Sequence, residues 1–209
     1  PLNADGYFFT AFWTTFMTGP NPGILDWYTV LMGIVGAAVL TVHGAHFLAV
    51  KTGGEIYHRA HRIAEVGGWV VAPLTVVAIL AIPIVQPALR LNFDANSVGY
   101  VFPVLALAAL VGMVWFRSKQ KDFLSFLASS VFIGSLLSSA AWGLFPNILV
   151  ATQDPTNNLT IYNAATSAYS MEVGLIWFSL GLTLVLIYTV YVYWSFWGRV
   201  EPSTLGDDE

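Results

Sequence analysis

Two histidines three residues apart, His43 and His46, lie in a long apolar stretch of the sequence. On a helix, residues at this spacing lie on adjoining parts of one face. One short helical stretch cannot bind a haem from both sides, but either imidazole could be a single axial ligand. Either could also relay protons, because histidine titrates near neutral pH. The alternative is a histidine that hydrogen-bonds at a helix contact or near the headgroups, and the sequence favours this structural interpretation.

Two carboxylates, Asp26 and Glu172, precede or begin apolar segments. We expect Glu172 to start a membrane span on the outer side, where it could bind a quinone hydroxyl or take part in proton release. A carboxylate in a first helical turn is also what the helix dipole favours, so we favour a structural role for Glu172. Asp26 is predicted to be an N-cap.

The basic stretch Lys51–Arg62 also contains His58 and His61. We expect this stretch to be a loop that sets the membrane topology and contacts anionic lipid. The sequence contains no pattern typical of a phosphate-binding loop, a zinc site or a hydrolase triad. It also has no cysteine, which excludes disulfides, thiolate metal ligands and cysteine nucleophiles.

The composition is that of a membrane protein. Of 209 residues, 56% are hydrophobic and 10% are charged, and the mean hydropathy is +0.69, whereas a soluble domain is about 25% charged. The apolar residues occur in runs of about 20, enough to cross a hydrocarbon core of roughly 30 Å. We therefore expect this chain to lie in the lipid bilayer and not to bind nucleic acid.

These runs predict an all-α, polytopic integral membrane protein with five transmembrane helices in a single domain, residues 1–209. The expected spans cover about 27–50, 64–85, 98–116, 123–145 and 171–197. Pro73 predicts a kink in the second span. Small residues at spacings of four predict two stripes of helix contact: Ala64, Gly68 and Ala72 in the second span, and Ser130, Gly134 and Ser138 in the fourth.

The orientation follows from the Lys and Arg residues. If five spans alternate, seven of the eight fall on one side and Arg90 alone falls on the other. Positive charge accumulates in cytoplasmic loops. The sequence therefore predicts a cytoplasmic C-terminus and an outer location for the polar segment 147–170.

Four stretches, in order, resemble subunit II of the cytochrome bd family of quinol oxidases, including its cyanide-insensitive branch. They are Gly19–Tyr28 (GPNPGILDWY), His43-Gly-Ala45 leading to Lys51-Thr52, Leu144–Asn147 (LFPN) and Leu159–Ser167 (LTIYNAATS). The last stretch, placed before a final helix that ends in Tyr193-Trp194, is the most specific. The likeness extends over essentially the whole chain.

The resemblance implies a subunit of nine helices, of which this chain looks like the last five: one four-helix bundle and one peripheral helix. It implies a non-haem structural subunit of a respiratory terminal oxidase, which oxidises quinol, reduces oxygen to water and takes up cytoplasmic protons. The expected location is the cytoplasmic membrane of a bacterium or archaeon.

The same resemblance implies that haems b and d reside in a partner, the haem-carrying subunit I, which this chain would support and shield. Small accessory membrane subunits could accompany the pair. The acidic and tryptophan residues that the family links to proton and oxygen entry belong to the first half of subunit II. No catalytic, cofactor-binding or metal-binding residue can therefore be carried over, and His43, His46 and Glu172 remain polar candidates without an assigned role.

Two rival interpretations follow from the residues alone. A secondary transporter or permease half would carry paired charges or broken helices near the bilayer midplane, and the expected spans have almost no charge there. A haem-binding membrane cytochrome would use His43 as its axial ligand.

Overall fold

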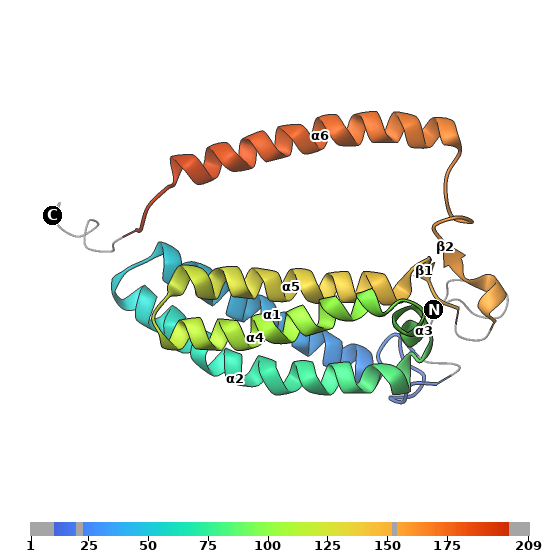
Figure 1. Ribbon diagram of the computed structural model, residues 1–209, viewed down its shortest axis with the longest axis horizontal. Helices are drawn as coiled ribbons and strands as arrows, with labels where there is room; N and C mark the ends of the chain where they lie inside the picture. The colour runs from blue at the N-terminus through green and yellow to red at the C-terminus, as the bar shows by residue number, and fades with distance from the viewer. Residues whose placement is uncertain (1–10, 20–22, 152–153, 201–209) are drawn as a thin grey trace.

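The computed structural model describes residues 11–19, 23–151 and 154–200, and within these ranges the chain is mostly helical (Figure 1). Its long helices are α1 (Trp27–Lys51), α2 (Gly54–Val85), α4 (Val101–Ser118), α5 (Asp122–Leu144) and α6 (Ala168–Ser195). A short helix, α3 (Ala88–Ala95), and the 3₁₀ turn η1 (Ser97–Tyr100) connect α2 to α4. Among the described residues, five helices are long and apolar enough to cross a membrane, which confirms the expected polytopic membrane fold.

Four of these helices, α1, α2, α4 and α5, form an antiparallel bundle in which α1 contacts α2 and α5, and α4 contacts α5 and α2. The core of the bundle is built from small and medium-sized apolar side chains, with Phe132 and Met113 as its largest fully buried members. Small side chains let helix backbones approach closely, which is how helices associate in lipid.

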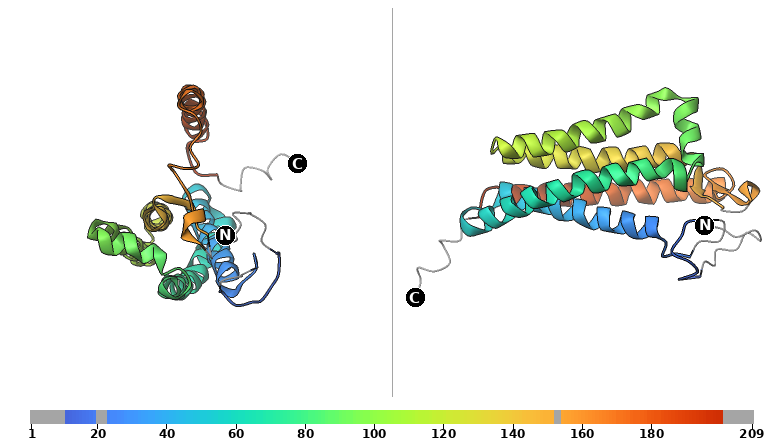
Figure 2. Two further views of the ribbon diagram at one scale, coloured as in Figure 1. Left: turned by 90° about the vertical axis from the view of Figure 1, so that its right-hand side faces the viewer. Right: turned by 90° about the horizontal axis from the view of Figure 1, so that it is seen from below.

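The fifth long helix, α6, stands apart from the bundle. Figure 2 shows α6 separated from the four bundled helices, and none of its residues is buried. Apolar side chains surround α6 on every side, as expected for a helix that contacts lipid or the surface of another protein. The described structure is therefore a four-helix bundle plus one peripheral helix.

Helix α1 begins at the N-cap that the sequence predicted. The Asp26 carboxylate accepts hydrogen bonds from the backbone N–H groups of Tyr28 and Thr29, at 2.8 and 2.9 Å. The Thr29 hydroxyl oxygen accepts in return from the Asp26 N–H, at 3.0 Å. This reciprocal capping box satisfies N–H groups that a helix start leaves free. The neighbouring Pro20, Asn21 and Pro22, part of the first resemblance stretch, lie outside the described residues, as does the tail 201–209.

The basic stretch that was expected to be a loop is largely helical, and so is the short segment around Arg90 between two expected spans. The turn after α1 is closed by Gly54, whose φ of 60° suits glycine, and α2 then runs through the basic stretch Lys51–Arg62 from Gly54 onward. Glu55 and Arg59 form an ion pair at 3.1 Å across one helical turn. The segment around Arg90 forms α3. The expectation failed because hydropathy detects the apolar part of a helix and misses polar turns that extend it.

The two predicted contact stripes have different outcomes. Ala64 and Gly68 are buried on α2, so the first stripe contacts the bundle. On α5, by contrast, Gly134 is exposed and a β-carbon there would have nothing within 4 Å. Within the described bundle the second stripe is not a contact at Gly134, because the buried face of α5 is a different one and consists of Ser125, Ala128, Ser129, Phe132, Ser135 and Gly143. Pro73 lies inside α2, and its kink stays a prediction.

The polar segment after α5 contains a small hairpin. Strand β1 (Asn147–Leu149) pairs antiparallel with β2 (Leu159–Thr160), and the 3₁₀ turn η2 (Pro155–Asn157) lies between them. Beside this hairpin, the Asn92 amide of α3 donates to the carbonyl oxygens of Trp142, Gly143 and Phe145. Helix ends leave such carbonyls without partners, so α3 caps the C-terminal end of α5.

Candidate functional site at the basic end of the bundle

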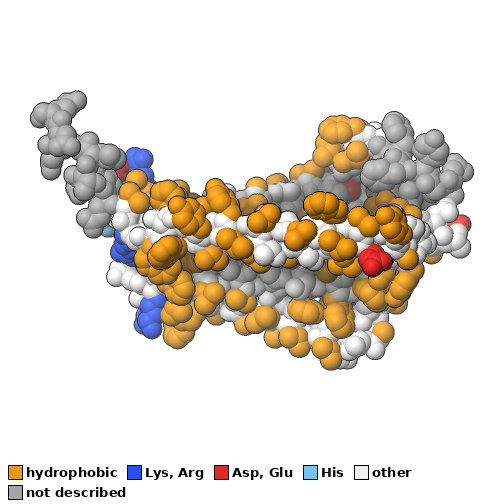
Figure 3. Space-filling model, turned by 90° about the horizontal axis from the view of Figure 1, so that it is seen from above, with side chains coloured by type: hydrophobic (Ala, Val, Ile, Leu, Met, Phe, Trp, Pro, Cys, Tyr) orange, Lys and Arg blue, Asp and Glu red, His pale blue; other side chains and the backbone are white. Residues whose placement is uncertain are grey.

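Cationic side chains gather at one end of the molecule, as Figure 3 shows. We call this the basic end: the C-terminal end of α1, the start of α2, the end of α4, the start of α5 and the segment after α6. It carries Lys51, Arg59, Arg62, Arg117, Lys119, Lys121 and Arg199. Arg90 belongs to α3, near the C-terminal end of α5. His43 and His46 also lie in the half of α1 that is nearer the basic end.

His43 joins α1 to α5. Its Nδ1 lies 2.8 Å from the Ser129 hydroxyl oxygen, and its ring stacks on Phe126 with 5.0 Å between the ring centroids. The Ser129 hydroxyl donates to the Phe126 carbonyl at 2.7 Å. Because that bond uses the hydroxyl proton, the His43 Nδ1–H is the donor to Ser129. His43 is thus held as an interhelical hydrogen-bond donor.

His46 lies deeper in the bundle, with 2% of its surface exposed. Its Nε2 has no hydrogen-bond partner among the described residues. Its electrostatic neighbours are Arg117 of α4, His61 of α2 and His43 of α1. In the described ranges, no group of three or more His, Cys, Asp or Glu side chains is arranged to hold a metal ion. His46 is therefore a buried imidazole whose neighbours are two histidines and an arginine.

Asp122, the first residue of α5, connects three parts of the chain. One carboxylate oxygen lies 3.4 Å from Arg199 Nη2, and the other lies 3.8 Å from His61 Nε2. The Asp122 side chain is 11% exposed and that of Arg199 is 57% exposed. A second pair, Arg117 with Glu65 at 3.4 Å, links α4 to α2. The ion pairs therefore tie α2, α4, α5 and the segment after α6 together at this end.

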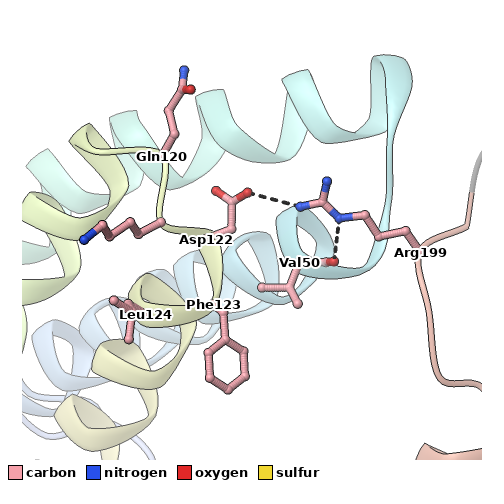
Figure 4. A pocket seen from close by; sticks show the side chains of 7 residues that line it. Val50, Gln120, Asp122, Phe123, Leu124 and Arg199 are labelled. Atoms are coloured by element: carbon pink, nitrogen blue, oxygen red, sulfur yellow. Dashed lines mark hydrogen bonds and ion pairs between the residues drawn. The ribbon is translucent and has the colours of Figure 1, made fainter.

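The chain after α6 is fastened to the α1–α2 turn. Arg199 Nε donates to the Val50 carbonyl at 3.3 Å (Figure 4), and Lys51 Nζ donates to the Phe196 carbonyl at 3.2 Å. The Val200 N–H donates to the Lys51 carbonyl at 2.8 Å. From the sequence, Arg199 served only to orient the chain in the membrane. Its contact with the α1–α2 turn was missed because no sequence pattern indicates that the segment after the last helix returns to the end of the first.

A cavity of about 410 Å³ opens between these elements. Figure 4 shows Asp122 and Arg199 facing each other beside it. It is lined by Val50, Gln120, Lys121, Asp122, Phe123, Leu124 and Arg199. One wall of the cavity is therefore charged and the other is apolar. The cavity lies where α1 ends and α5 begins.

Glu172 is not part of this site. It is exposed on α6 and has no hydrogen bond or ion pair with the described residues. Helix α6 begins at Ala168, with Ser167 as its N-cap, and has no acidic residue in its first turn. The dipole explanation for Glu172 was therefore wrong, because the helix starts one turn earlier than its apolar run. The structure brings His43 and His46 to the same region and leaves Glu172 on the separate helix.

The chain matches the family model described as cytochrome bd terminal oxidase subunit II over residues 4–196. It is 22% identical to "Cytochrome bd-I ubiquinol oxidase subunit 2" of Escherichia coli K12, over 98% of this chain and 60% of that protein. It is 25% identical to "Cytochrome bd ubiquinol oxidase subunit 2" of Bacillus subtilis, over 85% and 52%. It is 21% identical to "Probable cytochrome oxidase subunit 2" of Haemophilus influenzae, over 89% and 56%. The chain thus spans between half and two thirds of these relatives' length.

Proposed function

The chain belongs to the cytochrome bd terminal oxidase subunit II family, and on that basis we propose that it is part of a respiratory oxidase that oxidises quinol and reduces oxygen to water. The observation that carries the proposal is the match over residues 4–196, which includes all five apolar helices. Within such a complex its role is structural. It supplies a packed helical surface that supports and shields a haem-carrying subunit I.

The bundle's interior supports a structural role. Its core is formed by apolar side chains of all four bundled helices, among them Val42, Val71, Met113 and Phe132. Arg117 and Asp122 lie at helix ends, where Arg117 pairs with Glu65 and Asp122 pairs with Arg199. A secondary transporter or permease half would need charged or broken-helix positions near the midplane. The transporter alternative is therefore the weaker one.

Several finer assignments belong to the same proposal. Haems b and d are assigned to subunit I, and small accessory subunits are further partners. The family assignment supports a cytoplasmic membrane of a bacterium or archaeon as the location of the complex, and the charge bias favours the basic end on the cytoplasmic side. The chain would correspond to the last five of nine helices, and its coverage of 60% of the Escherichia coli relative agrees with that share of the length.

Purification of the complete protein through a tag on this chain tests the proposal. We expect a larger haem-carrying subunit to co-purify, together with quinol-dependent oxygen consumption. A chain that purifies alone and catalyses solute transport in vesicles would refute it.

A spectrum separates the structural role from haem binding by this chain. If subunit I holds the haems, we expect the His43→Ala variant of the complex to have the same haem absorption as the unchanged protein. His58→Ala is the matched control, because His58 is an exposed histidine of the same end. Loss of one haem signal in His43→Ala alone would refute the structural role.

A further inference from the structure

We propose that the cavity at the basic end is a binding site for one anionic phospholipid, whose phosphate contacts Lys121 and Arg199 and whose acyl chain lies along α5. The cavity has about 410 Å³ and is lined by residues of α1, of the α4–α5 turn, of the start of α5 and of the segment after α6. It is thus built from parts of the chain that are far apart in sequence.

The charges around the cavity favour an anion. Lys121 and Arg199 line it with one carboxylate, Asp122. Asp122 is already compensated, because it pairs with Arg199 at 3.4 Å and lies 3.8 Å from His61. The Lys121 ammonium has no ion pair or hydrogen bond within the described part of the chain. Basic pockets between transmembrane helices are typical sites for phosphate headgroups.

Arg199 can accept a second anion beside Asp122. Its guanidinium has five N–H donors in a planar fork. Two of its nitrogens are used in the described contacts, Nε by the Val50 carbonyl and Nη2 by Asp122. The Arg199 side chain is 57% exposed, so the remaining donors can reach a phosphate oxygen. Arginine is well suited to such planar recognition of phosphate.

The opposite side of the cavity is apolar and continues toward the middle of the membrane. Phe123 lines the cavity, and Phe123, Leu127 and Val131 are exposed by 63%, 48% and 37%. Residues four apart lie on one face of a helix, and eight residues of helix span about 12 Å. Gly134, one turn further, has nothing near its β-carbon position. The stripe therefore offers an acyl chain an uninterrupted track.

A lipid explains this combination better than a free anion does. Free phosphate would use the charged wall alone, whereas a phospholipid would also use the apolar stripe next to it. Because α6 has no buried residue, the stripe on α5 is not covered by α6. A lipid whose headgroup sits at the cavity and whose chain follows α5 uses both features.

The test counts lipids on the complete protein, purified in detergent with its bound subunits, by native mass spectrometry. Phosphatidylglycerol and phosphatidylcholine are added in parallel, and inorganic phosphate is added as a competitor. We expect one phosphatidylglycerol to be retained in preference to phosphatidylcholine, and Lys121→Gln to weaken its retention about fivefold. Lys119→Gln is the matched control, since Lys119 lies in the same turn but does not line the cavity.

Three results would overturn the proposal. Equal retention of phosphatidylcholine would show that charge does not select the lipid. An equal effect of Lys119→Gln would show a general attraction of the basic end. Displacement of phosphatidylglycerol by millimolar phosphate would show a site for free anions. Phe123→Ser provides a second variant that keeps every charge, and we expect it to weaken binding of long-chain more than of short-chain phosphatidylglycerol.

Discussion

Gly67 of α2 lies directly against the Val42 side chain of α1, so that a β-carbon at position 67 would overlap Val42 Cγ2. Val42 is 2% exposed and belongs to the core cluster that fills the bundle. The side chain therefore cannot turn away into open space. The absence of a side chain at position 67 sets how closely α1 approaches α2.

Substitution at this contact has a predicted cost. Gly67→Ala should lower the free energy of unfolding by about 1–3 kcal/mol, as overpacking of a core does. Unfolding of the complete protein by sodium dodecyl sulfate in mixed micelles measures this change. Gly68→Ala is the control, because its β-carbon would meet Val114 Cγ2 at 3.8 Å, an ordinary contact. Val42→Ala should restore part of the stability lost in Gly67→Ala, and equal effects of the two glycine variants would contradict the prediction.

The hydrogen bond between His43 and Ser129 gives a second prediction. Ser129→Ala removes the acceptor of the His43 Nδ1–H, which lies 2.8 Å away. We expect a loss of about 1–3 kcal/mol in the same unfolding measurement, because a donor inside the bundle is left without a partner. Ser130→Ala is the control, since the Ser130 hydroxyl bonds to the Phe126 carbonyl of its own helix at 3.0 Å. A loss of the same size in Ser130→Ala would mean that the interhelical bond is not the cause.

His46 should respond in the opposite way. Its Nε2 is buried without a partner among the described residues. Burying such an atom removes its hydrogen bonds to water, and no hydrogen bond in the protein replaces them, so it lowers the stability of the fold. We therefore expect His46→Leu to leave the stability unchanged or to raise it. A marked loss of stability in His46→Leu, measured beside Ser129→Ala, would show that the imidazole has a partner beyond the described residues.

The cap that α3 provides gives a fourth prediction. Asn92→Ala removes the amide that donates to three carbonyl oxygens at the end of α5. Faster amide hydrogen exchange is expected in the last turn of α5 and in the β1–β2 hairpin next to it, because local opening becomes easier. Asn96→Ala, which changes a cap on the following 3₁₀ turn, should leave exchange in α5 unchanged. Unchanged exchange at the end of α5 in Asn92→Ala would contradict the capping role.

Much of the membrane fold could be predicted because apolar runs of span length and the asymmetry of Lys and Arg are direct consequences of the bilayer. The N-cap at Asp26 was equally readable, since it depends on neighbours along the chain. The helical extension at Gly54 and the helix α3 were missed because polar helical turns lack an apolar signature. The buried face of α5 was misplaced because it uses Ser125, Ser129 and Phe132, whereas small-residue spacing pointed to Gly134.

The candidate site was readable in part. His43 and His46 were singled out from sequence, but Ser129, the partner of His43, and Arg117, a charged neighbour of His46, lie on other helices. Asp122 and Arg199 were not singled out, because their pairing depends on the chain returning to the bundle after α6. Long-range pairs of this kind have no signature in one sequence.

The separate helix α6 has a mechanical consequence. It has 28 residues, about 42 Å at 1.5 Å per residue, whereas α5 has 23 residues, about 35 Å by the same rise. Both ends of α6 are attached at the two ends of the bundle, through the β1–β2 hairpin and through the Thr52–Val200 bridge. A membrane helix adjusts to the bilayer thickness chiefly by tilting. Because both ends of α6 are tied to the bundle, the bundle limits the tilt that α6 can adopt.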